Sequence, residues 1–141
     1  MEVELLKNLV DYGVIALLIA MSFISVLFFI ERLFFYRKLN INDYRSEKAL
    51  EVALTKHLTT IGTIASNSPY IGLLGTVLAI MLTFMTMSEG DIEATKIMSS
   101  LALALKATAV GLVVAIISMI FYNILSRYAE VKIVEYENKE V

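Results

Sequence analysis

Three long apolar segments, separated by charged stretches, dominate the pattern of this chain. Each is close to the roughly 20 apolar residues that an α-helix needs to cross a hydrocarbon core about 30 Å thick. The predicted spans cover about residues 12–30, 69–87 and 101–125. The second is placed from Pro69 onward, because proline suits the first turn of a helix, where its missing N–H leaves no bond unmade. We therefore predict an all-α membrane protein with three transmembrane helices.

The helical pattern extends beyond the membrane on one side. The third segment continues without proline from about Ser99 to Glu137, and such a helix, about 57 Å long, must project from the bilayer. In the linker, residues 31–68, four apolar side chains recur at helical spacing: Leu50, Leu54, Leu58 and Ile61. The linker and the tail, residues 126–141, are predicted to form a helical bundle under the membrane. The chain then makes a single membrane domain over residues 1–141.

Composition supports a membrane protein and excludes several kinds of chemistry. Of the 141 residues 58% are hydrophobic and the mean hydropathy is +0.74, whereas an average soluble domain is roughly 45 to 50% apolar. The net charge of −2 carries no nucleic-acid signature. The absence of cysteine excludes disulfides, thiol chemistry and cysteine-based metal sites. The pattern contains no nucleophile–base arrangement, phosphate loop or metal cluster, so we expect no enzyme activity, no cofactor and no metal.

Lysine and arginine residues near the spans predict the orientation, because cytoplasmic loops retain them. Nine lie in the linker and the tail, whereas only Lys7 and Lys96 lie on the opposite side. We expect the N-terminus outside the cytoplasm and the C-terminus inside it. The reverse orientation is the alternative.

Small and polar residues share one face in each of the last two spans. In the third span that face has spacings of four, three, four, three and four, and consists of Ala104, Thr108, Gly111, Ala115, Ser118 and Tyr122. In the second span it consists of Gly72, Thr76, Thr83 and Met87, beside the small pair Gly75 and Ala79. Such faces either pack helices together, with each hydroxyl bonded to its own backbone one turn back, or line a hole shared by identical subunits. Spacing alone leaves both interpretations open.

Two strings in these spans resemble a known family. SPYIGLLGTVL, from Ser68 to Leu78, and ALKATAVGLVVAI, from Ala104 to Ile116, are similar to the ExbB, TolQ and MotA family of proton-channel motor subunits, and to ExbB above all. The resemblance implies a homo-oligomer, a pentamer in the bacterial inner membrane, that encloses an ExbD-like partner and drives a TonB-like protein serving outer-membrane transporters. A TolQ-like role in envelope maintenance is the alternative, and the short linker disfavours a MotA-like stator.

The resemblance also implies roles for individual residues. It places the family's pore-facing threonines on Thr76 and Thr108. The expected proton pathway further includes Thr83, Gly111, Ala115, Ser118 and Tyr122, and the expected helix-packing residues are Gly72, Gly75 and Ala79. Several ExbB relatives carry a glutamate five positions before the third-span threonine. That position is Leu103 here, so the glutamate's role is not carried over.

Lys106 is the one charged residue inside the predicted spans. It lies about 160° around the helix from Thr108 and therefore faces elsewhere. Its long stem is expected to reach the membrane surface, or its ammonium to pair with an acidic group of a neighbouring subunit. A direct role in proton transfer is the alternative.

The predicted spans contain no Asp, Glu or His. Proton transfer through a membrane usually needs such a titrating group, and threonine hydroxyls do not titrate near neutral pH. We therefore expect an ExbD-like single-span partner to supply a transmembrane aspartate. Two other classes stay open: a non-conducting structural membrane scaffold, and a small secondary transporter, although the latter typically has inverted repeats or broken helices.

Overall fold

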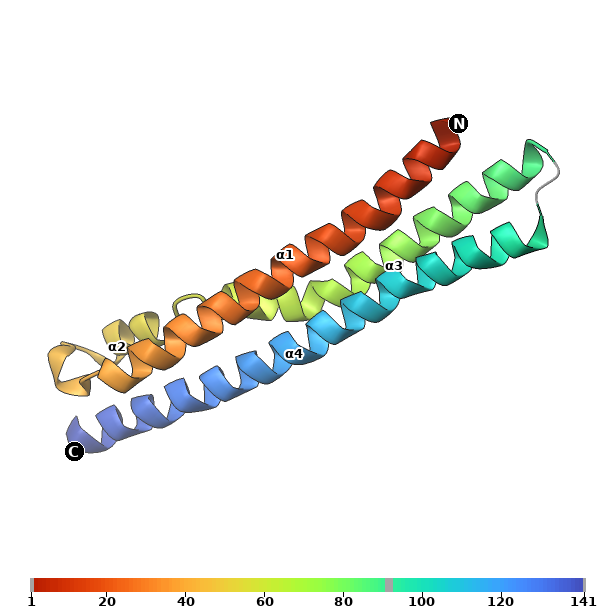
Figure 1. Ribbon diagram of the computed structural model, residues 1–141. Helices are drawn as coiled ribbons and strands as arrows, with labels where there is room; N and C mark the ends of the chain where they lie inside the picture. The colour runs from red at the N-terminus through yellow and green to blue at the C-terminus, as the bar shows by residue number, and fades with distance from the viewer. Residues whose placement is uncertain (1, 91–92, 141) are drawn as a thin grey trace.

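The computed structural model describes residues 2–90 and 93–140, and within them it contains helices and no strand. The elements are α1 (Glu2–Lys38), the short 3-10 helix η1 (Ile41–Asp43), α2 (Glu47–Thr55), α3 (Leu58–Ser88) and α4 (Ala94–Glu140). The helices α1, α3 and α4 form a long bundle in which α3 runs opposite to the other two (Figure 1). The start of α1, the end of α3 and the start of α4 lie at one end of this bundle, here called the loop end. The C-terminus and α2 lie at the other, here called the α2 end.

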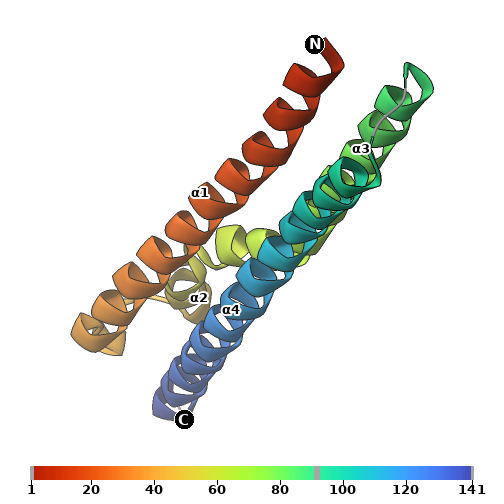
Figure 2. The ribbon, with the colours of Figure 1, turned by 45° about the vertical axis from the view of Figure 1, so that its right-hand side comes forward.

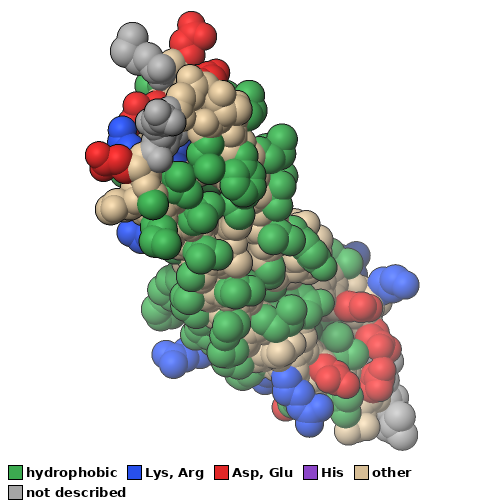
Figure 3. Space-filling model, turned by 90° about the vertical axis from the view of Figure 1, so that its right-hand side faces the viewer, with side chains coloured by type: hydrophobic (Ala, Val, Ile, Leu, Met, Phe, Trp, Pro, Cys, Tyr) green, Lys and Arg blue, Asp and Glu red, His purple; other side chains and the backbone are tan. Residues whose placement is uncertain are grey.

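The three long helices are each long and apolar enough to cross a membrane. On the face shown in Figure 3, hydrophobic side chains cover the middle of the molecule and charged side chains gather toward both ends. The prediction of three transmembrane helices is therefore confirmed. Each predicted span lies inside one of these helices, while the membrane boundaries themselves stay a prediction.

The sequence predicted that Pro69 begins the second membrane helix. In the structure Pro69 lies inside α3, which starts at Leu58. Inside a helix, proline lacks the N–H that would bond to the carbonyl one turn back, and its ring pushes against that turn. The helix α3 changes direction in its yellow-green first half (Figure 2), as expected for a proline kink. The prediction was wrong because membrane helices tolerate an interior proline when their neighbours compensate for the lost bond.

The linker face predicted from Leu50 to Ile61 is buried, but it belongs to two helices. Leu50 and Leu54 lie on α2, whereas Leu58 and Ile61 lie on α3, and all four are buried. His57 breaks the helix between them with a left-handed backbone (φ 70°), and its ring stacks on Phe28 at 4.1 Å between ring centroids. The periodicity therefore predicted burial correctly, although it did not predict the break.

The predicted bundle of linker and tail forms the main apolar core of the described residues. Its buried members come from all four α-helices: Tyr36, Leu50, Leu54, Leu58, Ile61, Leu125, Ala129 and Tyr136. The Tyr136 hydroxyl also donates a 3.0 Å hydrogen bond to the Tyr44 carbonyl, which ties the far end of α4 to the linker.

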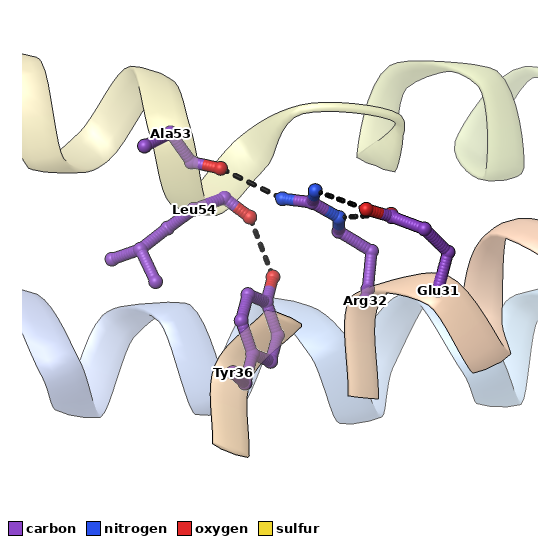
Figure 4. Close-up of polar contacts among 5 residues, drawn as sticks. All are labelled: Glu31, Arg32, Tyr36, Ala53 and Leu54. Carbon is purple, nitrogen blue, oxygen red and sulfur yellow. Dashed lines mark hydrogen bonds and ion pairs between the residues drawn. The ribbon is translucent and has the colours of Figure 1, made fainter. Parts of the chain in front are cut away.

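Two side chains of α1 bind the last carbonyl groups of α2 (Figure 4). The buried Arg32 donates to the Ala53 carbonyl at 2.8 Å and to both carboxylate oxygens of Glu31 at 2.6 and 2.7 Å. The Tyr36 hydroxyl donates to the Leu54 carbonyl at 2.5 Å. The final carbonyls of a helix have no partner within it, and a cation there is favourable. Arg32 and Tyr36 thus anchor α2 to the long bundle.

These contacts change two pKa values outside the predicted spans. The hydrogen bonds from Arg32 hold the pKa of the Glu31 carboxyl below its ordinary value. Burial raises the pKa of the Tyr36 hydroxyl to about 12. Tyr36 therefore keeps the proton that its bond to α2 requires over the whole physiological range.

The Tyr36 bond predicts a loss of stability in alkaline solution. Because the pKa of Tyr36 rises from 10.0 to about 12 on folding, its contribution is complete below about pH 10 and is lost as the pH rises to about 12. Tyr36→Phe should lower the free energy of unfolding by about 1 kcal/mol at neutral pH and remove this part of the alkaline loss. Thermal unfolding in detergent, followed by circular dichroism at several pH values, measures both effects. Tyr12→Phe, at an exposed tyrosine, is the control and should change neither; an alkaline loss as large in Tyr36→Phe as in the unmutated protein would contradict the prediction.

Candidate functional site

The helices α3 and α4 cross in backbone contact at Gly72 and Gly111. A Cβ atom on Gly72 would lie 2.8 Å from the Ala107 carbonyl oxygen, and one on Gly111 would lie 2.6 Å from the Ser68 carbonyl oxygen. Neither position has room for a side chain unless the helices move apart. Because Gly72 and Gly111 have no side chain, the backbones of α3 and α4 come into contact at the crossing. Small residues allow the same close approach between membrane helices in general.

Thr76 and Thr108, here called the threonine pair, meet beside this crossing. Their hydroxyl groups are hydrogen-bonded to each other. The Thr76 hydroxyl also lies 2.8 Å from the Ala104 carbonyl oxygen, and both hydroxyls are within reach of the Gly72 carbonyl oxygen, at 3.2 and 3.4 Å. Thr76 is buried and Thr108 is half-buried. The pair is thus a small polar centre between two apolar helices.

The hydrogen bond within the threonine pair can run in either of two directions, because each hydroxyl donates one hydrogen bond at a time. In one, Thr108 donates to Thr76, which donates to the Ala104 or the Gly72 carbonyl. In the other, Thr76 donates to Thr108, which donates to the Gly72 carbonyl. Rotation of two O–H bonds interchanges them. Such a pair can orient water or a neighbouring acid, but it does not itself gain or lose a proton near neutral pH.

The other residues proposed from the sequence occupy different surroundings. The buried hydroxyl of Thr83 donates to the Ala79 carbonyl of its own helix at 2.8 Å. Ala115 and Ser118 are buried, and Tyr122 packs against Gly62 near the α2 end. Gly75 contacts Val14 of α1. Lys106 is exposed, with no ion pair among the described residues.

The inward face of α1 contains polar residues that the sequence analysis did not single out. Every seventh residue is buried: Asp11, Leu18, Ser25 and Arg32. The Ser25 hydroxyl is hydrogen-bonded to that of Ser118 on α4 at 2.8 Å. A spacing of seven keeps residues on one side of a helix that packs along its neighbours, so this pattern was available in the sequence. It was missed because the first span was treated only by its apolar content.

The arrangement is that of a helical membrane bundle whose hydroxyl groups meet at a close helix crossing. The chain matches the model of the MotA/TolQ/ExbB proton channel family over residues 27–138 and belongs to that family. It is 50% identical over 135 residues to the biopolymer transport protein ExbB of Aquifex aeolicus, covering 95% of this chain and 91% of that protein. It is also 50% identical over 133 residues to a putative biopolymer transport protein, ExbB-like 2, of Helicobacter pylori, covering 94% and 89%. The Tol-Pal system protein TolQ of Haemophilus influenzae is 42% identical over 92 residues, covering 64% of this chain and 38% of that protein.

The crossing predicts a strong effect of a single methyl group. Gly111→Ala should lower the free energy of unfolding by about 1 to 3 kcal/mol, because the new Cβ meets backbone atoms that cannot turn away. Unfolding of the purified protein in detergent micelles measures this change. Gly13→Ala is the matched control, since its Cβ would meet nothing within 4 Å, and it should be neutral or stabilise by up to about 1 kcal/mol. Equal stability of the two variants would show that the helices do not cross this closely.

The Ser25–Ser118 bond predicts measurable coupling between α1 and α4. Ser25 and Ser118 are replaced by alanine singly and together, and the free energy of unfolding of each variant is measured. The double variant should differ from the sum of the single variants by a coupling energy of about 0.6 kcal/mol, typical of side-chain hydrogen bonds between membrane helices. Ser25→Ala combined with Ser99→Ala is the control. Ser99 lies about 28 Å along α4 from Ser118, so these two effects should add. Additive effects for Ser25 and Ser118 would mean that the bond is not formed.

Proposed function

We propose that this protein is a subunit of a proton-driven motor in the bacterial inner membrane that energises TonB-dependent transport across the outer membrane. The threonine pair is the observation that carries this proposal. It places two hydrogen-bonded hydroxyls beside a helix crossing, in two segments without acidic side chains. Membership of a proton channel family supports the proposal that these hydroxyls guide a proton-carrying group.

The moving part is proposed to be an ExbD-like single-span partner. Because the hydroxyls of the pair do not titrate, a carboxylate has to carry the proton past them. Protonation of the partner's aspartate removes its charge and lets it pass an apolar part of the wall, and deprotonation restores its attraction to the polar part. Identical copies of this chain form a ring around the partner, which a TonB-like protein links to the outer membrane.

The surface of the single chain is compatible with such a ring. Large apolar side chains on α3 and α4 remain exposed, among them Val77, Met81, Leu112 and Ile116. Thr108 is only half-buried, so one side of the threonine pair is open to a neighbouring helix or to water. Lys106 is available for an acidic group of the next subunit or for lipid headgroups. With nine of the basic residues toward the α2 end, that end is proposed to face the cytoplasm.

An ExbB-like role is favoured over a TolQ-like one by the extent of the similarity. The chain covers 89 and 91% of the two ExbB-type relatives, whereas it covers 38% of the TolQ protein. Its length is therefore close to that of these two ExbB-type relatives.

Replacing the half-buried member of the threonine pair tests the proposed function. Thr108→Val keeps the shape of the side chain and removes its hydroxyl. In the complex with its single-span partner, reconstituted into vesicles, proton flux should fall by roughly tenfold, the equivalent of one lost hydrogen bond worth about 1.4 kcal/mol. A pH-sensitive dye inside the vesicles measures the flux.

The matched control is Thr55→Val, which removes an exposed hydroxyl on α2 that bonds only to its own helix. It should leave the flux unchanged. Unaltered flux in a stably assembled Thr108→Val complex would reject the role of the pair. Absence of flux in the unmutated complex would favour a structural scaffold.

A further inference from the structure

Asp11 is a buried carboxylate without a partner. Its side chain is 1% exposed, and neither of its oxygens has a hydrogen-bond partner. All other buried side-chain nitrogen and oxygen atoms of the described residues are hydrogen-bonded. An ionised carboxylate is costly to bury without a donor, so this group must be protonated in place or gain a donor.

Asp11 lies at about the same depth in the bundle as the threonine pair. The helices α1 and α4 run in the same direction, and Ser25 contacts Ser118 (Figure 1). Asp11 precedes Ser25 by 14 residues, and Ala104 precedes Ser118 by the same number. Asp11 is therefore level with Ala104, whose carbonyl oxygen lies 2.8 Å from the hydroxyl of Thr76.

The contact between α1 and α3 supports this level independently. Val14 contacts Gly75, and the two helices run in opposite directions. Asp11, three residues before Val14, is then level with Leu78, three residues after Gly75. Leu78 is less than one helical turn from Thr76. Both neighbouring helices therefore place the carboxyl group near the depth of the threonine pair.

A pocket at the loop end lies beside the turn of α1 that precedes Asp11. It has a volume of about 300 Å³ and is lined by Glu4, Lys7, Asn8, Thr83, Thr86, Lys96, Ile97, Ser99, Ser100 and Leu103. Lys7 and Asn8 precede Asp11 by four and three residues and so share its face of α1. Thr83 of α3 also lines the pocket, and its side chain is buried. Two residues of the pocket wall, Lys7 and Asn8, thus lie about one helical turn before Asp11 along α1.

The groups around Asp11 fit a proton better than a metal ion. The charged groups of the pocket are Glu4 and Lys7 on α1 and Lys96 on α4, while α3 contributes only the hydroxyls of Thr83 and Thr86. A bound cation such as Ca²⁺ needs about six oxygen ligands, and the described residues contain no group of three acidic or histidine side chains. A proton needs a single oxygen. A neighbouring subunit has no access to a side chain that is already 1% exposed.

We propose that Asp11 is a proton-binding site of this chain, loaded from the loop end through the pocket and level with the threonine pair. A proton from water in the pocket forms an O–H bond to one carboxylate oxygen, which changes the side chain from −1 to neutral, and release reverses the step. Burial raises the pKa of the Asp11 carboxyl above its ordinary value and favours the neutral form, while nearby Lys7 acts in the opposite direction to a smaller extent. The role of this proton in driving motion rests on the proposed function, whereas its binding does not.

Infrared difference spectroscopy on the purified protein tests the binding itself. A protonated carboxyl group has its own C=O stretching band, and a pH titration should show this band for Asp11. The band should be missing in Asp11→Asn, displaced in Asp11→Glu, and unchanged in Asp43→Asn, the same chemical change at an exposed acid. Spectra of Asp11→Asn and Asp11→Glu identical to that of the unmutated protein would overturn the proposal. If Asp11→Asn fails to fold, the displacement of the C=O band in Asp11→Glu still shows whether Asp11 binds a proton.

Proton flux in the reconstituted complex tests the use of the site. Asp11→Asn should lower the flux by about 100-fold, the usual range for loss of a positioned proton-transfer group, while Asp11→Glu and Asp43→Asn keep most of it. Flux that is normal in assembled Asp11→Asn, or that follows Na⁺ in place of H⁺, would overturn the proposal. An unmutated complex without flux would reject the proposed motor function, and the infrared band would still decide whether Asp11 binds a proton.

Discussion

The close approach of α3 and α4 at Gly72 and Gly111 is the constraint on which the rest of the structure depends. In lipid, helices gain little from burying apolar surface, so packing contacts and hydrogen bonds have to hold them together. The missing side chains let the backbones touch, and this contact brings the Thr76 hydroxyl within 2.8 Å of a carbonyl on the other helix. The helix α1 then joins the pair through Val14 against Gly75 and through the bond between Ser25 and Ser118.

The polar groups of the bundle follow one rule with one exception. An unsatisfied polar group in an apolar environment costs several kcal/mol, so each buried hydroxyl finds an acceptor on its own helix or on the next one. Thr83 and Ser68 bond to their own backbone, whereas the threonine pair and Ser25 bond across helices. Among the residues that the structure describes, only the buried side chain of Asp11 has no hydrogen-bond partner. A polar group that is kept buried at such a cost is a candidate for function.

The two ends of the bundle are held in different ways. At the α2 end, Arg32 and Tyr36 of α1 bind carbonyls of α2, and Tyr136 of α4 binds the linker. These hydrogen bonds surround one apolar core, to which α3 also contributes. At the loop end, the same three long helices surround a pocket lined by charged and hydroxyl-bearing side chains. The closed end holds the helices in position, and the pocket end gives access to their interior.

The sequence by itself determined the class of the protein, the three membrane helices and the small, polar face of the second and third, but not the inward face of the first. The length of an apolar run and the helical spacing of its residues are local features of the sequence. They therefore indicate directly a helix that contacts lipid on one side and neighbouring helices on the other. The long third helix and the burial of Leu50 to Ile61 followed from the same reasoning. The family strings led to Thr76 and Thr108, although spacing could not say whether these residues touch.

Only the tertiary structure decided the contacts between elements. Whether Pro69 starts or kinks a helix depends on the neighbours that replace its lost bond, and the break at His57 depends on the core beneath it. Arg32 and Asp11 both looked like charges just outside the first span, yet one is satisfied by Glu31 and α2 and the other has no partner. Burial and pairing of a charge depend on what the rest of the fold places around it, and no local pattern contains that information.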